Sequence, residues 1–118
     1  MRGGRDLSII DQASLPSSGT AHELEGYLHG DVAVSIIVVD APPGSGPSLH
    51  KHPYEEIFIV QEGRATFVLG DEELEVSAGQ IVIGPADVPH RWVNSGTERL
   101  RQVDIHASPR FITEWLDS

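Results

Sequence analysis

Short runs of apolar residues alternate with polar, glycine and proline residues along this chain, a pattern typical of β-strands joined by turns. The clearest run, residues 32–39, has apolar side chains at both even and odd positions. Further strands are predicted at residues 24–29, 56–60, 65–69, 74–76 and 80–83, around His90, and at 100–105. No long stretch has the period of a helix, so the sequence predicts an all-β sandwich or barrel.

The connecting segments and the chain ends complete this outline. Turns at residues 61–63 and 70–72 are expected to fold three successive strands into a β-meander. Residues 109–118 have the apolar spacing of one short C-terminal helix, for which Ser108 is a suitable cap and Pro109 fits the first turn. Residues 1–20 form an N-terminal arm that either pairs with a neighbouring sheet or frays. We expect a single domain over residues 1–118, with the barrel at 21–108.

The strand predicted at residues 56–60 is apolar on both faces. Alternation places Phe58 and Val60 on the same face as Glu56, and Ile57 and Ile59 on the opposite face. A small barrel covers only the inner face of its strands. The outer face is therefore expected to meet the N-terminal arm, the C-terminal helix or a second subunit.

Three histidines and one carboxylate are spaced as metal ligands on strands. His50 and His52 alternate, so their side chains project to the same side of an extended chain, about 7 Å apart along it. Glu56 opens the next apolar strand, and His90 follows a turn-rich segment, so it is able to approach from a neighbouring strand. The sequence predicts a metal site with three nitrogen ligands and one oxygen ligand.

The predicted ligands do not determine which metal ion is bound. The chain has no cysteine, so no thiolate favours zinc, and three imidazoles with one carboxylate suit a divalent Mn, Fe, Ni, Co, Cu or Zn ion. An octahedral ion held by four protein groups keeps two positions for a substrate, or for a substrate and dioxygen.

The four predicted ligands belong to two sets of residues with regular spacing. The first consists of Gly44, His50, His52, Glu56 and Gly63, and the second of Gly79, Pro85, His90 and Asn94. In both spacings the sequence resembles the two motifs of the cupin superfamily. This resemblance implies a cupin-type double-stranded β-helix, or jelly-roll barrel, with a bound metal, and it favours a homodimer. Asp87 stands where the second motif has Gly, but Asp tolerates a left-handed conformation, so the site is expected to be intact.

Three further residues are candidates for contact with a substrate. Phe58 shares the face of Glu56, and Trp92 shares the face of His90, so both are predicted to line a pocket, although core packing explains Trp92 equally well. His106 is a candidate catalytic base. It lies with Gln102 and Asp104 on one face of the last strand, which faces either the pocket or the solvent.

Charge narrows the possible partners. The net charge of −10 argues against binding to nucleic acid or to an anionic membrane surface. No apolar run has the length of a membrane span, and the first ten residues hold too short a run for a signal peptide, which predicts a cytoplasmic protein.

Two functions remain open at this point. The first is a metal-dependent enzyme, of dioxygenase or isomerase/cyclase type, that acts on a small oxygen-rich organic molecule. The second is a non-catalytic module that binds or senses a small ligand. The fold hosts many functions, so the motifs alone do not choose between them.

Overall fold

The computed structural model describes residues 9–116, and within them almost all regular structure is β-strand. The strands are β1 (Ala21–Leu24), β2 (Ser35–Ala41), β3 (His50–Lys51), β4 (Glu56–Glu62), β5 (Arg64–Leu69), β6 (Glu72–Ser77), β7 (Ile81–Gly84), β8 (His90–Val93), β9 (Leu100–His106) and β10 (Glu114–Trp115). Two short 3₁₀ turns, η1 (Gln12–Ser14) and η2 (Gly26–Leu28), are the only helical elements in this part of the chain. The predicted all-β fold is confirmed.

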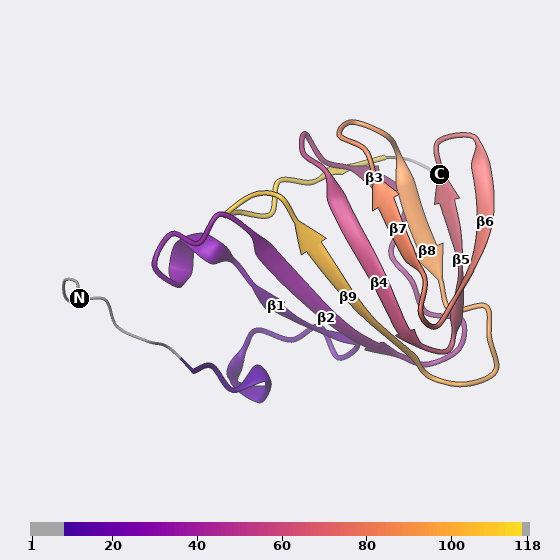
Figure 1. Ribbon diagram of the computed structural model, residues 1–118, viewed down its shortest axis with the longest axis horizontal. Helices are drawn as coiled ribbons and strands as arrows, with labels where there is room; N and C mark the ends of the chain where they lie inside the picture. Colours follow the sequence, from indigo (N-terminus) through magenta and orange to yellow (C-terminus); the bar gives the residue numbers. More distant parts are fainter. Residues whose placement is uncertain (1–8, 117–118) are drawn as a thin grey trace.

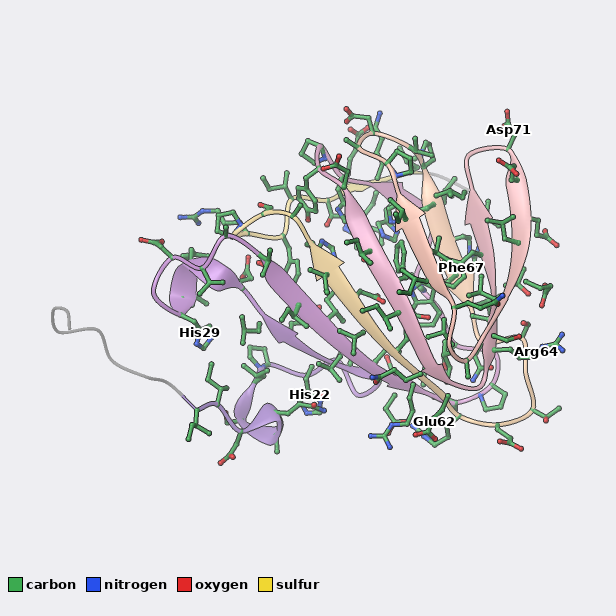
Figure 2. The ribbon with its side chains drawn as sticks, viewed as in Figure 1. His22, His29, Glu62, Arg64, Phe67 and Asp71 are labelled. Atoms are coloured by element: carbon green, nitrogen blue, oxygen red, sulfur yellow. The ribbon has the colours of Figure 1, made fainter. Side chains whose placement is uncertain are left out.

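The strands form two five-stranded sheets that face each other (Figure 1). One sheet has the order β1-β2-β9-β4-β7 and the other has the order β10-β3-β8-β5-β6, and the pairs described within both are antiparallel. The apolar core lies between them, with Phe58 from the first sheet packed edge-to-face on Phe67 from the second. In Figure 2 the Phe67 side chain lies between the layers, whereas Asp71 lies at the tip of the β5–β6 hairpin. This is a jelly-roll arrangement.

The predicted meander is wrong at its first turn. β4 and β5 follow each other along the chain but belong to different sheets, and only β5 and β6 form a hairpin. Gly63 lies between β4 and β5 with a φ of +83°, and a Cβ there would lie 2.6 Å from the carbonyl oxygen of Arg99. This glycine lets the chain cross to the opposite sheet instead of folding back on the same one.

The predicted C-terminal helix is also wrong within the described residues, because the chain bends at residues 107–110 and then runs through residues 111–116 without helix to β10, which pairs with β3. Residues 117 and 118 of that prediction lie outside the described residues. The backbone groups that a helix would pair internally are used elsewhere. The N–H of Leu116 donates to the carbonyl oxygen of Leu49, and the carbonyl oxygen of Ile112 accepts from His52. The hydroxyl of Ser108 does accept from the N–H of Arg110, as a cap would, but no helix follows.

The N-terminal half differs from the prediction in its strand boundaries. The strand expected at residues 24–29 instead covers Ala21–Leu24, and Gly26–Leu28 form a turn. A Cβ at Gly26 would lie 2.0 Å from the carbonyl oxygen of Val32, so this turn packs tightly against the start of the β2 segment, and β2 begins at Ser35 instead of Val32. The expected arm is described only from residue 9. There Ser17 forms a single bridge with His22, and the part before residue 9 lies outside the described residues.

The inner and outer faces of β4 follow the predicted alternation. Glu56, Phe58 and Val60 are buried, whereas Ile57 is 37% exposed. Ile81 and Ile83 on the neighbouring strand β7 are 61% and 62% exposed, so the outer face of this sheet carries uncovered apolar side chains. Among the residues that the structure describes, no helix is long and apolar enough to cross a membrane.

Candidate metal centre

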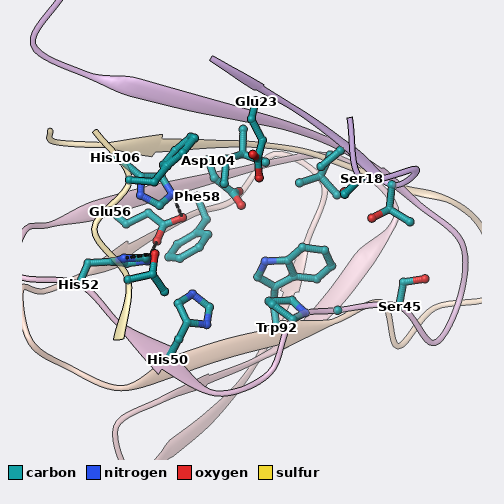
Figure 3. A pocket seen from close by; sticks show the side chains of 18 of the residues that line it. Ser18, Glu23, Ser45, His50, His52, Glu56, Phe58, Trp92, Asp104 and His106 are labelled. Atoms are coloured by element: carbon teal, nitrogen blue, oxygen red, sulfur yellow. Dashed lines mark hydrogen bonds and ion pairs between the residues drawn. The ribbon is translucent and has the colours of Figure 1, made fainter. Parts of the chain in front are cut away.

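Two cross-strand pairs, one from each sheet, build the centre of the site. His50 of β3 lies opposite His90 of β8, and Glu56 of β4 lies opposite His106 of β9. Directly opposed residues of an antiparallel pair project to the same face, so each pair directs two side chains into the space between the sheets. His52 follows β3 immediately and supplies the fifth side chain (Figure 3).

The four predicted ligands come together. Each of His50, His52, Glu56 and His90 is buried, and one possible ligand atom from each lies within 4.8 Å of those of the others. The Nε2 atoms of His52 and His90 lie 3.1 Å and 3.2 Å from Oε1 of Glu56. His22 and His29 lie on the β1 and η2 side of the molecule, away from this cluster (Figure 2).

Hydrogen bonds to the backbone set the tautomer of each histidine in the cluster. Nδ1 of His50 donates to the carbonyl oxygen of Ser48 at 2.7 Å, and Nδ1 of His90 donates to that of Val88 at 3.1 Å. Nδ1 of His52 donates to the carbonyl oxygen of Ile112 at 2.8 Å. A carbonyl oxygen only accepts, so Nδ1 carries a proton in all three rings, and in the neutral form of each ring Nε2 presents a lone pair.

This arrangement passes a simple test of fit to a metal ion. Nε2 of His52 is buried and has no hydrogen-bond partner among the described residues, although it lies beside a carboxylate oxygen. When the rings are neutral, their Nε2 lone pairs and the carboxylate face each other in a buried space, and such a set of acceptors is complementary to a cation. Three imidazole nitrogens and one carboxylate oxygen therefore fit a divalent transition metal ion.

The pKa values of His50 and Glu56 favour the charge states that bind a metal ion. Burial, with smaller effects from the neighbouring His90 and His52, lowers the pKa of His50 to about 4, so this ring is neutral at physiological pH. Burial alone would raise the pKa of Glu56, but contacts from His106, His52 and His90 outweigh it and leave that pKa well below its ordinary value. Neutral imidazole and ionised carboxylate are the forms that bind metals.

His106 differs from the other histidines in both of its ring nitrogens. Its Nε2 lies 3.0 Å from Oε2 of Glu56, the oxygen that the other histidines do not approach. Its Nδ1 lies 2.7 Å from the hydroxyl of Tyr54, which accepts in turn from the N–H of Ile112 at 3.3 Å. Burial raises the pKa of Tyr54 to about 12, so its hydroxyl keeps its proton and is able to donate it to His106.

A cavity of about 670 Å³ opens onto the cluster. Phe58 and Trp92, the two side chains predicted to line a pocket, lie in its wall, and His106 and Asp104 of β9 face it as well (Figure 3). Trp115 also lines the cavity, and its ring lies 4.9 Å from that of His50. No sequence pattern places Trp115 at the site, because the apolar spacing of its segment predicts a helix and not a strand beside His50.

The turn residues of the two motifs behave as their spacing suggests. Gly44 and Gly79 have φ angles of +87° and +90°, and Asp87, which replaces a motif glycine, has a φ of +65°. The N–H of Asp87 donates to the carbonyl oxygen of His52 at 2.7 Å, so this left-handed turn ties the His90 loop to a ligand. Asn94 is buried and bonds to the backbone of Ala41, Glu98 and Gly96, which shapes a turn.

Comparison with known proteins agrees with this geometry. The family model described as "Cupin domain" matches residues 37–106, which include the four clustered residues and most of the strands. Auxin-binding protein 4 of Zea mays is 34% identical over 117 residues, which cover 89% of this chain and 57% of that protein. The polyketide synthase CurC of Streptomyces cyaneus is 43% identical over 68 residues, covering 57% of this chain and 44% of that protein. The chain thus spans about half the length of these relatives.

Solved structures share the fold at lower identity. An oxalate oxidase structure superposes with a TM-score of 0.79 at 20% identity, covering 98% of this chain and 66% of that chain. A double-stranded β-helix protein of Klebsiella pneumoniae superposes with a TM-score of 0.73 at 23% identity, covering 96% of this chain and all of that one. From the family match, the two facing sheets and the clustered histidines and glutamate, we conclude that this chain belongs to the cupin family.

Proposed function

We propose that this chain binds one divalent transition metal ion through His50, His52, Glu56 and His90, and that it acts on a small oxygen-rich organic molecule as a metal-dependent enzyme. The observation that carries this proposal is the clustering of four buried ligand side chains, in which a backbone carbonyl holds Nδ1 of each histidine. Nε2 of His52 and Nε2 of His90 then lie 3.1 Å and 3.2 Å from Oε1 of Glu56. Such preorganisation is what a metal site needs and what the apolar core does not need.

Two types of reaction suit this site. One is a dioxygenation, and the other is an isomerisation or cyclisation. A bound divalent ion supplies Lewis acidity towards an enolate or carboxylate, or activates oxygen when it is Fe, Mn or Ni. The chain's own residues hold the substrate: Phe58 and Trp92 offer an apolar wall beside the four ligands, and the cavity is large enough for a small organic molecule.

We assign His106 a positioning role instead of the role of a free general base. Both of its nitrogens face protein groups: Nδ1 faces the Tyr54 hydroxyl, and Nε2 lies 3.0 Å from Oε2 of Glu56, although Nε2 makes no hydrogen bond within the described residues. By holding Oε2 of Glu56, His106 leaves Oε1 directed at His52 and His90. In this role it sets the direction in which the carboxylate meets the ion.

The proposal is tested by elemental analysis of protein purified without a nickel column. We expect about one equivalent of a single transition metal, and we expect its loss in His52→Ala but not in the matched control His29→Ala. Oxygen consumption and product formation are then measured with small phenols and diketones. A protein that binds no ion after reconstitution with each metal, or that keeps full turnover without metal, would contradict the proposal.

One observation favours a second function, a non-catalytic module that binds a small ligand. Several relatives are named as auxin-binding proteins, and three of them align with 89% of this chain. The same cavity and ligand set serve binding as well as catalysis. Tight binding of a small ligand to every metal form, without product under air, would favour this function over the enzyme.

We also propose that the chain forms a homodimer. The outer face of the first sheet carries a shallow groove of about 320 Å³, whose lining includes Ile57, Ile83 and Ile105. β7 is the edge strand of this sheet, and within the described residues no strand covers its outer edge. A second copy of the chain offers the same apolar patch, and two-fold packing would bury both patches at once.

A further inference from the structure

Asp104, a polar residue outside the proposed ligand set, lies in the wall of the cavity and pairs with Gln102 of the same strand. Gln102 and Asp104 project from the inner face of β9 and are only 1% and 3% exposed. Nε2 of Gln102 donates to Oδ1 of Asp104 at 2.8 Å, and this is the one side-chain hydrogen bond that the structure gives this carboxyl within the described residues. Oε1 of Gln102 is buried without a partner there. The pair is therefore incompletely satisfied.

The residues directly opposite this pair on both neighbouring strands are apolar, so the fold itself gains little from it. Asp104 lies opposite Phe58 on β4 and opposite Ile37 on β2, and both of these side chains line the cavity. Burying a carboxyl among such neighbours is costly unless it finds partners. Asp104 faces the cavity, so the missing partner is able to come from a bound molecule (Figure 3).

The charges of the cavity restrict what that molecule can be. Its lining includes the carboxyl groups of Glu23, Glu56 and Asp104, and among the described residues it includes no Lys or Arg. Burial, together with the negative charge of Glu56, raises the pKa of Asp104 well above its ordinary value, which favours a neutral carboxyl. A second negative charge on a ligand would meet no protein cation there.

We propose that Asp104, held in place by Gln102, is a second anchor of the binding site, and that it selects small ligands carrying a hydroxyl group over analogues with a methyl group or a second carboxylate at the same place. A hydroxyl both donates and accepts, so it complements this carboxyl whether or not the carboxyl is protonated. The inference rests on the proposed function, because the other end of the ligand is taken to meet the metal ion.

The test uses protein loaded with one equivalent of Zn²⁺, a redox-inert ion, and isothermal titration calorimetry. The probes are three matched sets of phenylacetates, one set for each of the 2-, 3- and 4-positions. Within a set, the ring carries a hydroxyl, a methyl or a carboxylate group at that position. We expect at least one hydroxyl isomer to bind about tenfold more tightly than its methyl counterpart, and the corresponding carboxylate to bind most weakly.

Variants assign the preference to Asp104. The nearly isosteric Asp104→Leu should reduce the hydroxyl-to-methyl ratio to within about twofold, whereas Asp104→Asn, which still donates and accepts, should keep part of it. The control Thr20→Val changes another polar residue of the lining and should keep the full ratio. Thermal unfolding checks that each variant folds, and Asp104→Asn keeps the test decisive if Asp104→Leu does not fold.

The inference and the proposed function fail in different ways. If the wild type does not bind Zn²⁺ at this site, the proposed function is overturned. If the wild type binds Zn²⁺ but every hydroxyl-to-methyl affinity ratio is near one, only the role of Asp104 as an anchor is overturned. The same conclusion follows if Asp104→Leu keeps the full ratio.

Discussion

Nε2 of His106 lies 3.0 Å from Oε2 of Glu56, while His52 and His90 both approach the other carboxylate oxygen, Oε1. The two oxygens of one buried carboxylate thus face different neighbours. Because His106 and Glu56 are directly opposed on adjacent antiparallel strands, the contact is built into the register of the sheet. A slip of either strand by one residue would turn its own side chain to the outer face and break the contact.

The first prediction concerns the strength of this positioning. His106→Phe keeps the ring but removes both nitrogens, so the Glu56 carboxylate loses the neighbour that orients it. We expect metal affinity to fall about 10- to 100-fold, the range typical for loss of a hydrogen-bonded neighbour of a ligand. His52→Ala should abolish binding, and Tyr54→Phe should have a smaller effect than His106→Phe. Competition with a fluorescent chelator measures all three, and wild-type affinity in His106→Phe would contradict the role.

The second prediction concerns pH and the buried carboxyl of Asp104. Its pKa is raised in the folded state, so above the ordinary pKa the folded state holds more protons than the unfolded state, and stability falls as pH rises through the raised value. Asp104→Asn removes this titration. We therefore expect the variant to gain thermal stability relative to the wild type as the pH rises from 5 to 9, measured as a Tm difference at each pH on metal-free protein. A Tm difference that is constant over this range would contradict the raised pKa.

The third prediction concerns the left-handed turn before His90. Asp87 has a φ of +65°, a conformation that a β-branched residue strongly disfavours. Asp87→Val should destabilise the protein by about 1–2 kcal/mol, whereas Asp87→Gly should be close to neutral. The neighbouring substitution Ala86→Val, at a position without a positive φ, is the control and should be near neutral. Urea unfolding compares the three, and equal effects at positions 86 and 87 would argue against strain as the cause.

The fourth prediction concerns assembly. Ile83→Lys places a charge in the middle of the exposed apolar face, so it should convert the expected dimer into a monomer at micromolar concentration. Leu28→Lys, which changes a comparably exposed residue on η2, should leave the dimer intact. Light scattering coupled to gel filtration measures both masses. A wild-type mass equal to one chain would contradict the homodimer.

Much of the fold was accessible from the sequence, because side-chain alternation reports directly on the faces of a strand. The alternation placed Glu56, Phe58 and Val60 on one buried face, as the structure confirms. Motif spacing likewise identified the four residues that the structure brings together. Asp87 kept the turn of the motif glycine, since its backbone tolerates the left-handed region.

What the sequence did not reveal depends on contacts between distant segments. The apolar spacing at residues 111–116 suits a helix, and only the backbone bonds to Leu49 and Tyr54 show why the segment runs extended. The role of His106 was hidden for a similar reason. Alternation placed it on one face with Asp104, but not whether that face was inside or outside, and the partner strands decided the question.

The bond from His52 to the carbonyl oxygen of Ile112 spans 60 residues and joins a proposed ligand to one of the last segments described. During synthesis, Ile112 leaves the ribosome after every residue of the four-residue cluster has already emerged. Until then, the His52 ring lacks the acceptor that sets its tautomer. If the site binds an ion as proposed, full affinity should therefore appear only after residue 112 has been translated, and a shorter nascent chain should compete poorly for scarce ions.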